Sequence, residues 1–415
     1  MQNITKTILL NAVKIFTISG LLFGNTIHVF GQDSTQTERN LNLISSIDGK
    51  TKMLLTAVAW GGLQANIQNA DKTIPKTTFN DFGFSPMFLW KLSDKAFFEG
   101  EVEIKNAGDK ENAAAFDLEF AKISLVLNKY ITVGVGKMLS PFGAYNEKWE
   151  PVHIERFANT PFRPDDKLLL DDTHLFWGAI TGLDVRGKIP IGTANLSYAL
   201  FLDNGPVLHT EKEMGGMIQY ENWNDNNSNK EIGGRIGLVP FANSSLEVGF
   251  SAKHGIASNQ GDSIYKNVGV TAYAIDLNYV KAFSSIKSII SFRGQFNMLN
   301  ADKTNYLLTD TSTYSFDNKL QSYFTQLSFR PAMVDNKYLK RLEFLLRFNA
   351  VTPPKEAIWN PGLDKNGIGG TIKRIDIGFD YWVSWRTGLR FAYEVTTNPD
   401  GTKSKQFLAR LATGL

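Results

Sequence analysis

From residue 51 onward the sequence divides into sixteen candidate β-strands whose connections are alternately short and long. Polar and apolar residues alternate within them, and a β-strand sends successive side chains to opposite faces. In residues 97–105, for example, charged residues occupy every second position from Glu99, with apolar residues or glycine between them. Each strand therefore has one apolar and one charged face. The candidates cover 52–63, 79–91, 97–105, 116–127, 131–138, 178–189, 193–203, 231–240, 244–253, 267–281, 286–298, 319–330, 341–350, 372–383, 387–396 and 404–415.

The rhythm of the connections selects one architecture. Short connections, several of them with turn-forming residues, alternate with long polar ones such as 139–177 and 204–230, and only 331–340 is ambiguous in length. An up-and-down barrel gives this rhythm because every second connection lies on the same rim. A propeller would repeat in blades of four strands, and a sandwich would need Greek-key crossings. We therefore expect an all-β fold, a transmembrane up-and-down antiparallel β-barrel of about 16 strands.

The N-terminus has the features of an export signal. Lys6 and Lys14 precede a short apolar run at residues 15–23, and small residues lie before Gln32. This pattern predicts a signal peptide at 1–31, although an apolar core segment would also fit. A short lead at 32–50 and the barrel at 51–415 complete the predicted organisation.

Charge and hydropathy exclude other classes of protein. The formal net charge is +3 and falls to +1 without the two signal-peptide lysines, so we expect no attraction to nucleic acid. After the signal no apolar run approaches 18 residues, so we expect no transmembrane helix. Alternating strands escape such a search because averaging over a window cancels their apolar face.

The polar faces are assigned to the barrel interior, since a charge facing lipid near the midplane costs several kcal/mol. We expect this many charges to need water, which predicts a water-filled lumen. The predicted pore-lining acids lie on the third and fourth strands, and they are Glu99, Glu101, Glu103, Asp117 and Glu119. The predicted pore-lining bases begin at the eighth strand, and they are Arg235, Arg293, Arg330, Arg347, Arg374, Arg390 and Arg410.

Two interpretations of these charges stay open. In a closed barrel of sixteen strands the third lies roughly opposite the eleventh. An acidic wall facing a basic wall would create a transverse field that orients charged or dipolar solutes. Alternatively, the inward charges wet the lumen and pair with their neighbours.

The connection at 139–177 is long enough to have a function of its own. Four prolines stiffen it, and it mixes aromatic, acidic and basic residues. We expect it to fold into the barrel and narrow the pore; an ordinary surface loop is the alternative. The predicted constriction residues are Pro141, Phe142, Gly143, Tyr145, Glu147, Glu150, Arg156 and Arg163.

Residues 133–143 read Val-Gly-Val-Gly-Lys-Met-Leu-Ser-Pro-Phe-Gly and precede Tyr145, Asn146 and Glu147. This segment resembles the phosphate-selective porin O and P family, and 198–206, 231–241 and 342–349 look like further segments of it. The resemblance implies a sixteen-stranded porin, commonly homotrimeric, that passes small hydrophilic solutes or ions through the outer membrane of a Gram-negative bacterium. It implies phosphate selectivity much less, because the long loop has no cluster of lysine or arginine.

Other functions stay as alternatives. A plugged structural or adhesive barrel would share the fold, and a transporter of hydrophobic compounds would need an apolar lining. An outer-membrane enzyme would need a serine and a histidine close together, but His153, His174, His209 and His254 all fall in or beside long loops, without a serine motif. We therefore predict no catalytic residue, no metal site and no cofactor, and we expect outer-membrane lipid and small hydrophilic solutes as partners.

Overall fold

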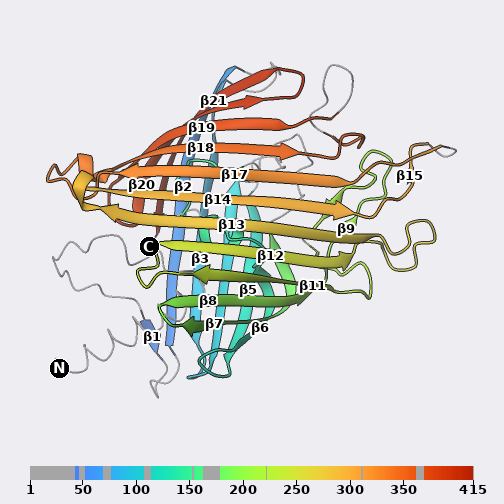
Figure 1. Cartoon of the computed structure of the whole chain (residues 1–415), viewed down its shortest axis with the longest axis horizontal. Helices are drawn as coiled ribbons and strands as arrows, with labels where there is room; N and C mark the ends of the chain where they lie inside the picture. The colour runs from blue at the N-terminus through green and yellow to red at the C-terminus, as the bar shows by residue number, and fades with distance from the viewer. Residues whose placement is uncertain are drawn as a thin grey trace.

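The computed structural model describes residues 43–45, 52–68, 76–106, 114–151, 154–161, 178–220, 222–309, 312–360 and 369–414. Sixteen antiparallel strands form a closed barrel, and pairing of the first strand with the last, with Gly62 opposite Arg410, completes it (Figure 1). The strands are β2 (Lys52–Gln68), β3 (Thr77–Lys91), β4 (Ala96–Asn106), β5 (Ala114–Val126), β6 (Thr132–Leu139), β7 (Ala179–Ile191), β8 (Ala194–Asp203), β11 (Glu231–Val239), β12 (Leu246–Ile256), β13 (Gly269–Phe283), β14 (Ser288–Ala301), β17 (Lys319–Arg330), β18 (Leu342–Thr352), β19 (Ile372–Trp382), β20 (Thr387–Thr397) and β21 (Lys403–Gly414). The predicted fold class is confirmed, and all sixteen predicted strands are present.

Three small features were not predicted. β1 (Leu43–Ser45) pairs with the start of β2. Two short hairpins lie within long connections, one formed by β9 (Val207–Leu208) and β10 (Ile218–Gln219), the other by β15 (Tyr306–Leu307) and β16 (Thr313–Tyr314). Strands of two or three residues are too short to show an alternating pattern, so sequence periodicity could not reveal them.

The connections divide between two rims. In Figure 1 the long ones, with β9 and β15, extend from one end of the barrel, and the tight turns close the other. The connection of ambiguous length, predicted at 331–340, belongs to the short-turn rim and ends in a 3₁₀ turn, Leu339–Arg341. On the long-loop rim, β20 and β21 are joined by a tight turn in which Asn398 N donates to Thr402 O at 2.9 Å.

The two faces of the barrel wall have opposite chemistry. On the outside, large apolar side chains are exposed, including Phe344 at 50 % and Ile377 at 57 %. On the inside, polar neighbours such as Arg347 and Asp376 are fully buried. This arrangement is the reverse of a water-soluble protein and is the one that a lipid environment favours. Among the described residues no helix is long and apolar enough to cross a membrane.

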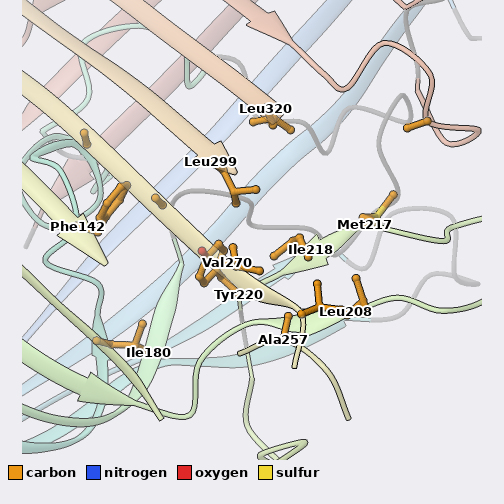
Figure 2. Packing of buried hydrophobic residues seen from close by; sticks show 14 of the residues in the cluster. Phe142, Ile180, Leu208, Met217, Ile218, Tyr220, Ala257, Val270, Leu299 and Leu320 are labelled. Carbon is orange, nitrogen blue, oxygen red and sulfur yellow. The ribbon is translucent and has the colours of Figure 1, made fainter. Parts of the chain in front are cut away.

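The largest apolar cluster lies toward the long-loop rim. Figure 2 shows it running from Phe142 past Val270 and Leu299 to Met217 and Ile218 in the loop between β8 and β11. Neighbouring loops are tied together by hydrogen bonds: the Trp359 indole N–H and the Tyr314 hydroxyl donate to Gly215 O at 3.2 and 3.0 Å. Within the same cluster, burial raises the pKa of Tyr306 to about 12. The long loops therefore pack against each other as a folded unit above the barrel.

Candidate pore constriction

The connection between β6 and β7 contacts the inward face of the opposite wall. Its described parts are residues 140–151 and 154–161. Gly143 N donates to Ser251 Oγ of β12 at 2.9 Å, and the amides of Ala144 and Tyr145 donate to Gln295 Oε1 of β14 at 2.8 and 2.9 Å. The inserted loop, as we call residues 140–161, thus leaves β6 and crosses the barrel interior.

The entry turn of the inserted loop depends on glycine. Gly143 has φ +72°, a left-handed conformation that side chains rarely adopt, and a Cβ there would clash with the Gln295 side chain that holds the loop. We expect Gly143→Ala to weaken loop insertion by about 1–3 kcal/mol, because strain and the lost amide contacts add. The measurement is the rate of tryptic cleavage at Lys148 in the folded barrel, which should rise.

Gly192 supplies the matched control for this substitution. Its φ is +60°, but a Cβ there would meet nothing within 4 Å. Gly192→Ala therefore introduces similar backbone strain without a clash, in a short turn far from the loop in sequence. Equal cleavage rates in the two variants would contradict the role given to the Gln295 contact.

The middle of the inserted loop is a single π-helical turn, Tyr145–Trp149. Two charges anchor it: Glu147 pairs with Arg186 of β7 at 2.9 Å, and Lys148 pairs with Glu247 of β12. The rings of Tyr145 and Trp149 pack edge-on against Phe324 of β17, with centroid distances of 5.4 and 6.0 Å. The turn is therefore held by walls on both sides of its path.

The far end of the inserted loop is held by buried ion pairs. Arg156 pairs with Glu343 of β18 at 3.0 Å and donates to Ser328 Oγ at 2.8 Å. Arg347 pairs with Asp376 at 2.7 Å, and its charge centre lies 4.3 Å from the centroid of the Phe157 ring. Arg347 also donates to the carbonyls of Asn159 and Thr160 at 3.1 and 3.2 Å.

Most of the predicted pore-lining arginines have local carboxylate neighbours. Arg235 pairs with Asp276 at 2.6 Å and with Glu247 at 3.1 Å, and Arg374 pairs with Asp376 at 3.0 Å. Such pairing compensates the cost of removing a charge from water.

Arg390 lies opposite Asp380 in the β19–β20 register, while two other arginines lie over aromatic rings. The charge centre of Arg293 lies 5.7 Å from the Trp149 ring centroid, and that of Arg330 lies 5.3 Å from the Trp382 ring centroid.

The expectation that the lumen-facing charges meet water is wrong for this side of the barrel. Arg293, Arg347, Arg374 and Arg390 are each 3 % exposed or less. The inserted loop packs over Arg293, Arg347 and Arg374 through Trp149, Phe157 and Thr160. Around Arg347 and Arg374, a carboxylate and loop carbonyls replace the solvent. The interpretation that inward charges pair with their neighbours therefore describes these strands.

The predicted acids lie on the other side and are less enclosed. Glu99, Glu101, Glu103 and Glu119 are all partly exposed, and the Asp117 side chain is 39 % exposed. Glu103 pairs with Lys105 at 2.5 Å, and Asp117 lies 3.6 Å from Lys137.

A β-bulge between β4 and β5 shifts the strand register near these acids. Phe120 pairs with Glu101 and Leu118 with Val102, so Glu119 is the extra residue. The bulge turns Phe120 and Lys122 to the same face as Asp117 and Glu119, which a strict alternation would not allow. Sequence reasoning therefore missed Lys122, which forms a buried 2.9 Å pair with Asp184 of β7.

Asp184 and Arg186 were also missed, although the alternation of β7 carried the signal for both. They lie on one face and pair with each other as well as with Lys122 and Glu147. Of the loop residues, Glu150 lies close enough to repel Glu101 and Glu119, and Pro141 and Phe142 are buried. Arg163 lies outside the described residues.

The described histidines take part in ordinary loop contacts. His209 lies 3.1 Å from Gln219 and 3.2 Å from Glu211, and His254 lies 2.9 Å from Thr271. His153 and His174 fall outside the part of the chain that the structure describes. Within that part, no three His, Cys, Asp or Glu side chains gather as a metal site would require.

No family model matches this chain, and neither does any curated protein. Solved structures do match. The outer membrane channel DcaP of Acinetobacter baumannii aligns with a TM-score of 0.56 at 13 % identity, covering 90 % of this chain and 99 % of that one. OmpF of Salmonella typhi, solved with daunomycin, aligns with a TM-score of 0.56 at 13 % identity, covering 90 % and 100 %. The chain has a porin fold. At such low identity the likeness concerns the fold.

Proposed function

We propose that this protein is an outer-membrane porin that allows passive diffusion of small hydrophilic solutes or ions. One observation carries the proposal. The chain forms a closed barrel with an apolar outer surface and a charged inner surface, and a loop from the barrel's own wall folds into its interior. A barrel of sixteen strands has room for an aqueous channel, whereas eight strands leave space only for side chains. An inserted loop would then set the size of the solutes that pass.

The resemblance of residues 133–143 extends the proposal to the phosphate-selective porin O and P family and to a homotrimer in the Gram-negative outer membrane. Support comes from the shared porin fold of DcaP and OmpF. The oligomeric state is tested by chemical cross-linking of the detergent-solubilised protein, where a trimer band that disappears on boiling is expected.

Liposome swelling tests the channel function. Vesicles with the folded protein should swell in small sugars such as arabinose, at rates that fall steeply as the sugar becomes larger, because the loop narrows the barrel. Vesicles with heat-denatured protein provide the control. Absence of swelling with every sugar would instead indicate a plugged structural or adhesive barrel.

A further inference from the structure

We propose that the inserted loop makes the passage off-centre, bounded by β2, β3, β4 and β5, and that this passage prefers cations and positively charged small solutes over anions. The inference rests on the proposed function and names the class of solute. It joins three observations: where the loop lies, how the charges it covers are balanced, and which charges stay open to solvent.

The inserted loop lies against one side of the barrel wall. Its described residues contact inward side chains of β12, β14, β17, β18 and β19, through Ser251, Gln295, Phe324, Glu343 and Arg374. Phe157 and Ala158 extend this packing to β20 and β21 through Ala392 and Leu408. Toward β4 and β5 the loop presents two carboxylates instead: Glu147 lies near Glu99, and Glu150 lies near Glu101 and Glu119. We place the passage between this acidic side of the loop and β2 to β5.

Solvent exposure agrees with this placement. On the covered side, the Arg347 and Asp376 side chains are 0 % exposed. On the open side, Gln64 and Asn66 of β2 and the inward acids of β4 and β5 are partly exposed. Solutes in the passage therefore contact the side chains of β2, β4 and β5 directly, whereas the loop separates them from Arg347 and Asp376.

The covered charges are largely balanced where they lie. Asp376 forms ion pairs with both Arg347 and Arg374. Glu343 pairs with Arg156, and Asp380 lies opposite Arg390 in the strand register. A buried pair has a weak external field because its opposite charges lie close together. The paired arginines therefore contribute little to the potential in the passage, which weakens the transverse-field interpretation; Arg293, whose Nε and Nη1 form no such pair among the described residues, lies over the Trp149 ring of the loop.

The open side has more carboxylates than cations. Its partly exposed acids are Glu99, Glu101, Glu103, Asp117, Glu119, Glu147 and Glu150, and Asp184 is a buried acid beside them. Its bases are Lys52, Lys91, Lys105, Lys122, Lys137 and Arg186, of which Lys122 and Lys137 are buried. Four of these bases pair with Glu103, Asp184, Asp117 and Glu147, and Lys91 pairs with Asp94 in the adjoining turn. Glu101 and Glu119 have no ion pair among the described residues, and Glu150 of the loop lies near both.

This imbalance predicts the sign of selectivity. A narrow passage with low-dielectric walls concentrates the field of its lining, so excess carboxylate raises the local concentration of cations and lowers that of anions. A potential of only −1 kT per unit charge would raise the local cation concentration, and lower the local anion concentration, by a factor of about 2.7. The resulting cation-to-anion permeability ratio is about 7. The preference is opposite to that of a phosphate-selective pore.

The test is the reversal potential of the protein in a planar bilayer under a KCl gradient. We expect a potassium-to-chloride permeability ratio of about 7 at roughly 0.1 M salt, falling toward 1 near 1 M as the Debye length shrinks from about 10 to 3 Å. A conducting channel with a ratio of 1 or below at low salt would overturn the inference and leave the porin proposal standing. Failure to form any channel would overturn both.

Paired variants locate the cause. Glu101→Gln combined with Glu119→Gln should lower the ratio at low salt at least about twofold, because it removes the two unpaired carboxylates while keeping side-chain volume. Asp335→Asn is the control: its side chain is 99 % exposed in a connection on the short-turn rim, and the ratio should not change. An unchanged ratio in the double variant, with a folded barrel shown by heat-modifiable migration, would assign the selectivity elsewhere and overturn the inference.

Discussion

A variant lacking residues 147–167 is expected to conduct severalfold more current per channel than the intact protein and to lose its cation preference. The deletion removes Trp149, Arg156 and Phe157, which fill the space between the two walls. It also removes Glu147 and Glu150 from the lining and uncovers the arginines of β14 to β20, so a passage that faced mainly carboxylates would face both signs of charge. Single-channel conductance and reversal potential in planar bilayers measure the two effects separately.

A second deletion controls for disturbance of the long-loop rim. Removing residues 211–213, an exposed turn between β9 and β10, shortens a loop without touching the barrel interior, and both quantities should keep their original values. Unchanged conductance after the 147–167 deletion would place the loop outside the conduction path. If the conductance rose but the cation preference stayed the same, the loop would not be what keeps the arginines from influencing the passage.

Substitution Arg347→Ala is expected to release the far end of the inserted loop. Arg347 is fully buried and joins Asp376 of β19 to Glu155, Asn159 and Thr160 of the loop. Removing one partner of a buried charge pair leaves the other uncompensated, at a cost of about 3–5 kcal/mol. Most of this cost can be relieved if the loop moves and admits water. We therefore expect noisier single-channel currents and faster tryptic cleavage at Arg156.

The partner substitution separates charge imbalance from lost packing. Asp376→Asn added to Arg347→Ala removes the orphaned carboxylate, so the double variant should hold the loop better than the single one. Arg347→Lys keeps the charge but lacks the planar fork that reaches both Asp376 and the loop carbonyls, so an intermediate cleavage rate is expected. If the single and double variants were cleaved equally fast, the ion pair would not be what fastens the loop.

Alternation located the strands well because each residue of the wall faces either lipid or the interior. The segment at 97–105 shows both the strength and the limit of this rule. Its glutamates do lie on the inward face, but the bulge beside Glu101 changes the parity of β5 at Glu119, and Lys122 was missed for that reason. A bulge depends on how two strands pair, which a single strand's pattern does not record.

The sequence by itself determined the barrel: the number of strands, their antiparallel order and, away from the bulge in β5, the face that side chains take, because period-two hydrophobicity directly reports the contrast between lipid and interior. It also indicated that residues 139–177 were exceptional. Only the tertiary structure decided which charges meet water. That choice depends on contacts such as Arg347 with Asn159, which are 188 positions apart, and on carboxylates that neutralise arginines across neighbouring strands. Long-range pairing of this kind leaves no local periodic signal, because in the sequence each partner looks the same as any other inward-facing charged residue.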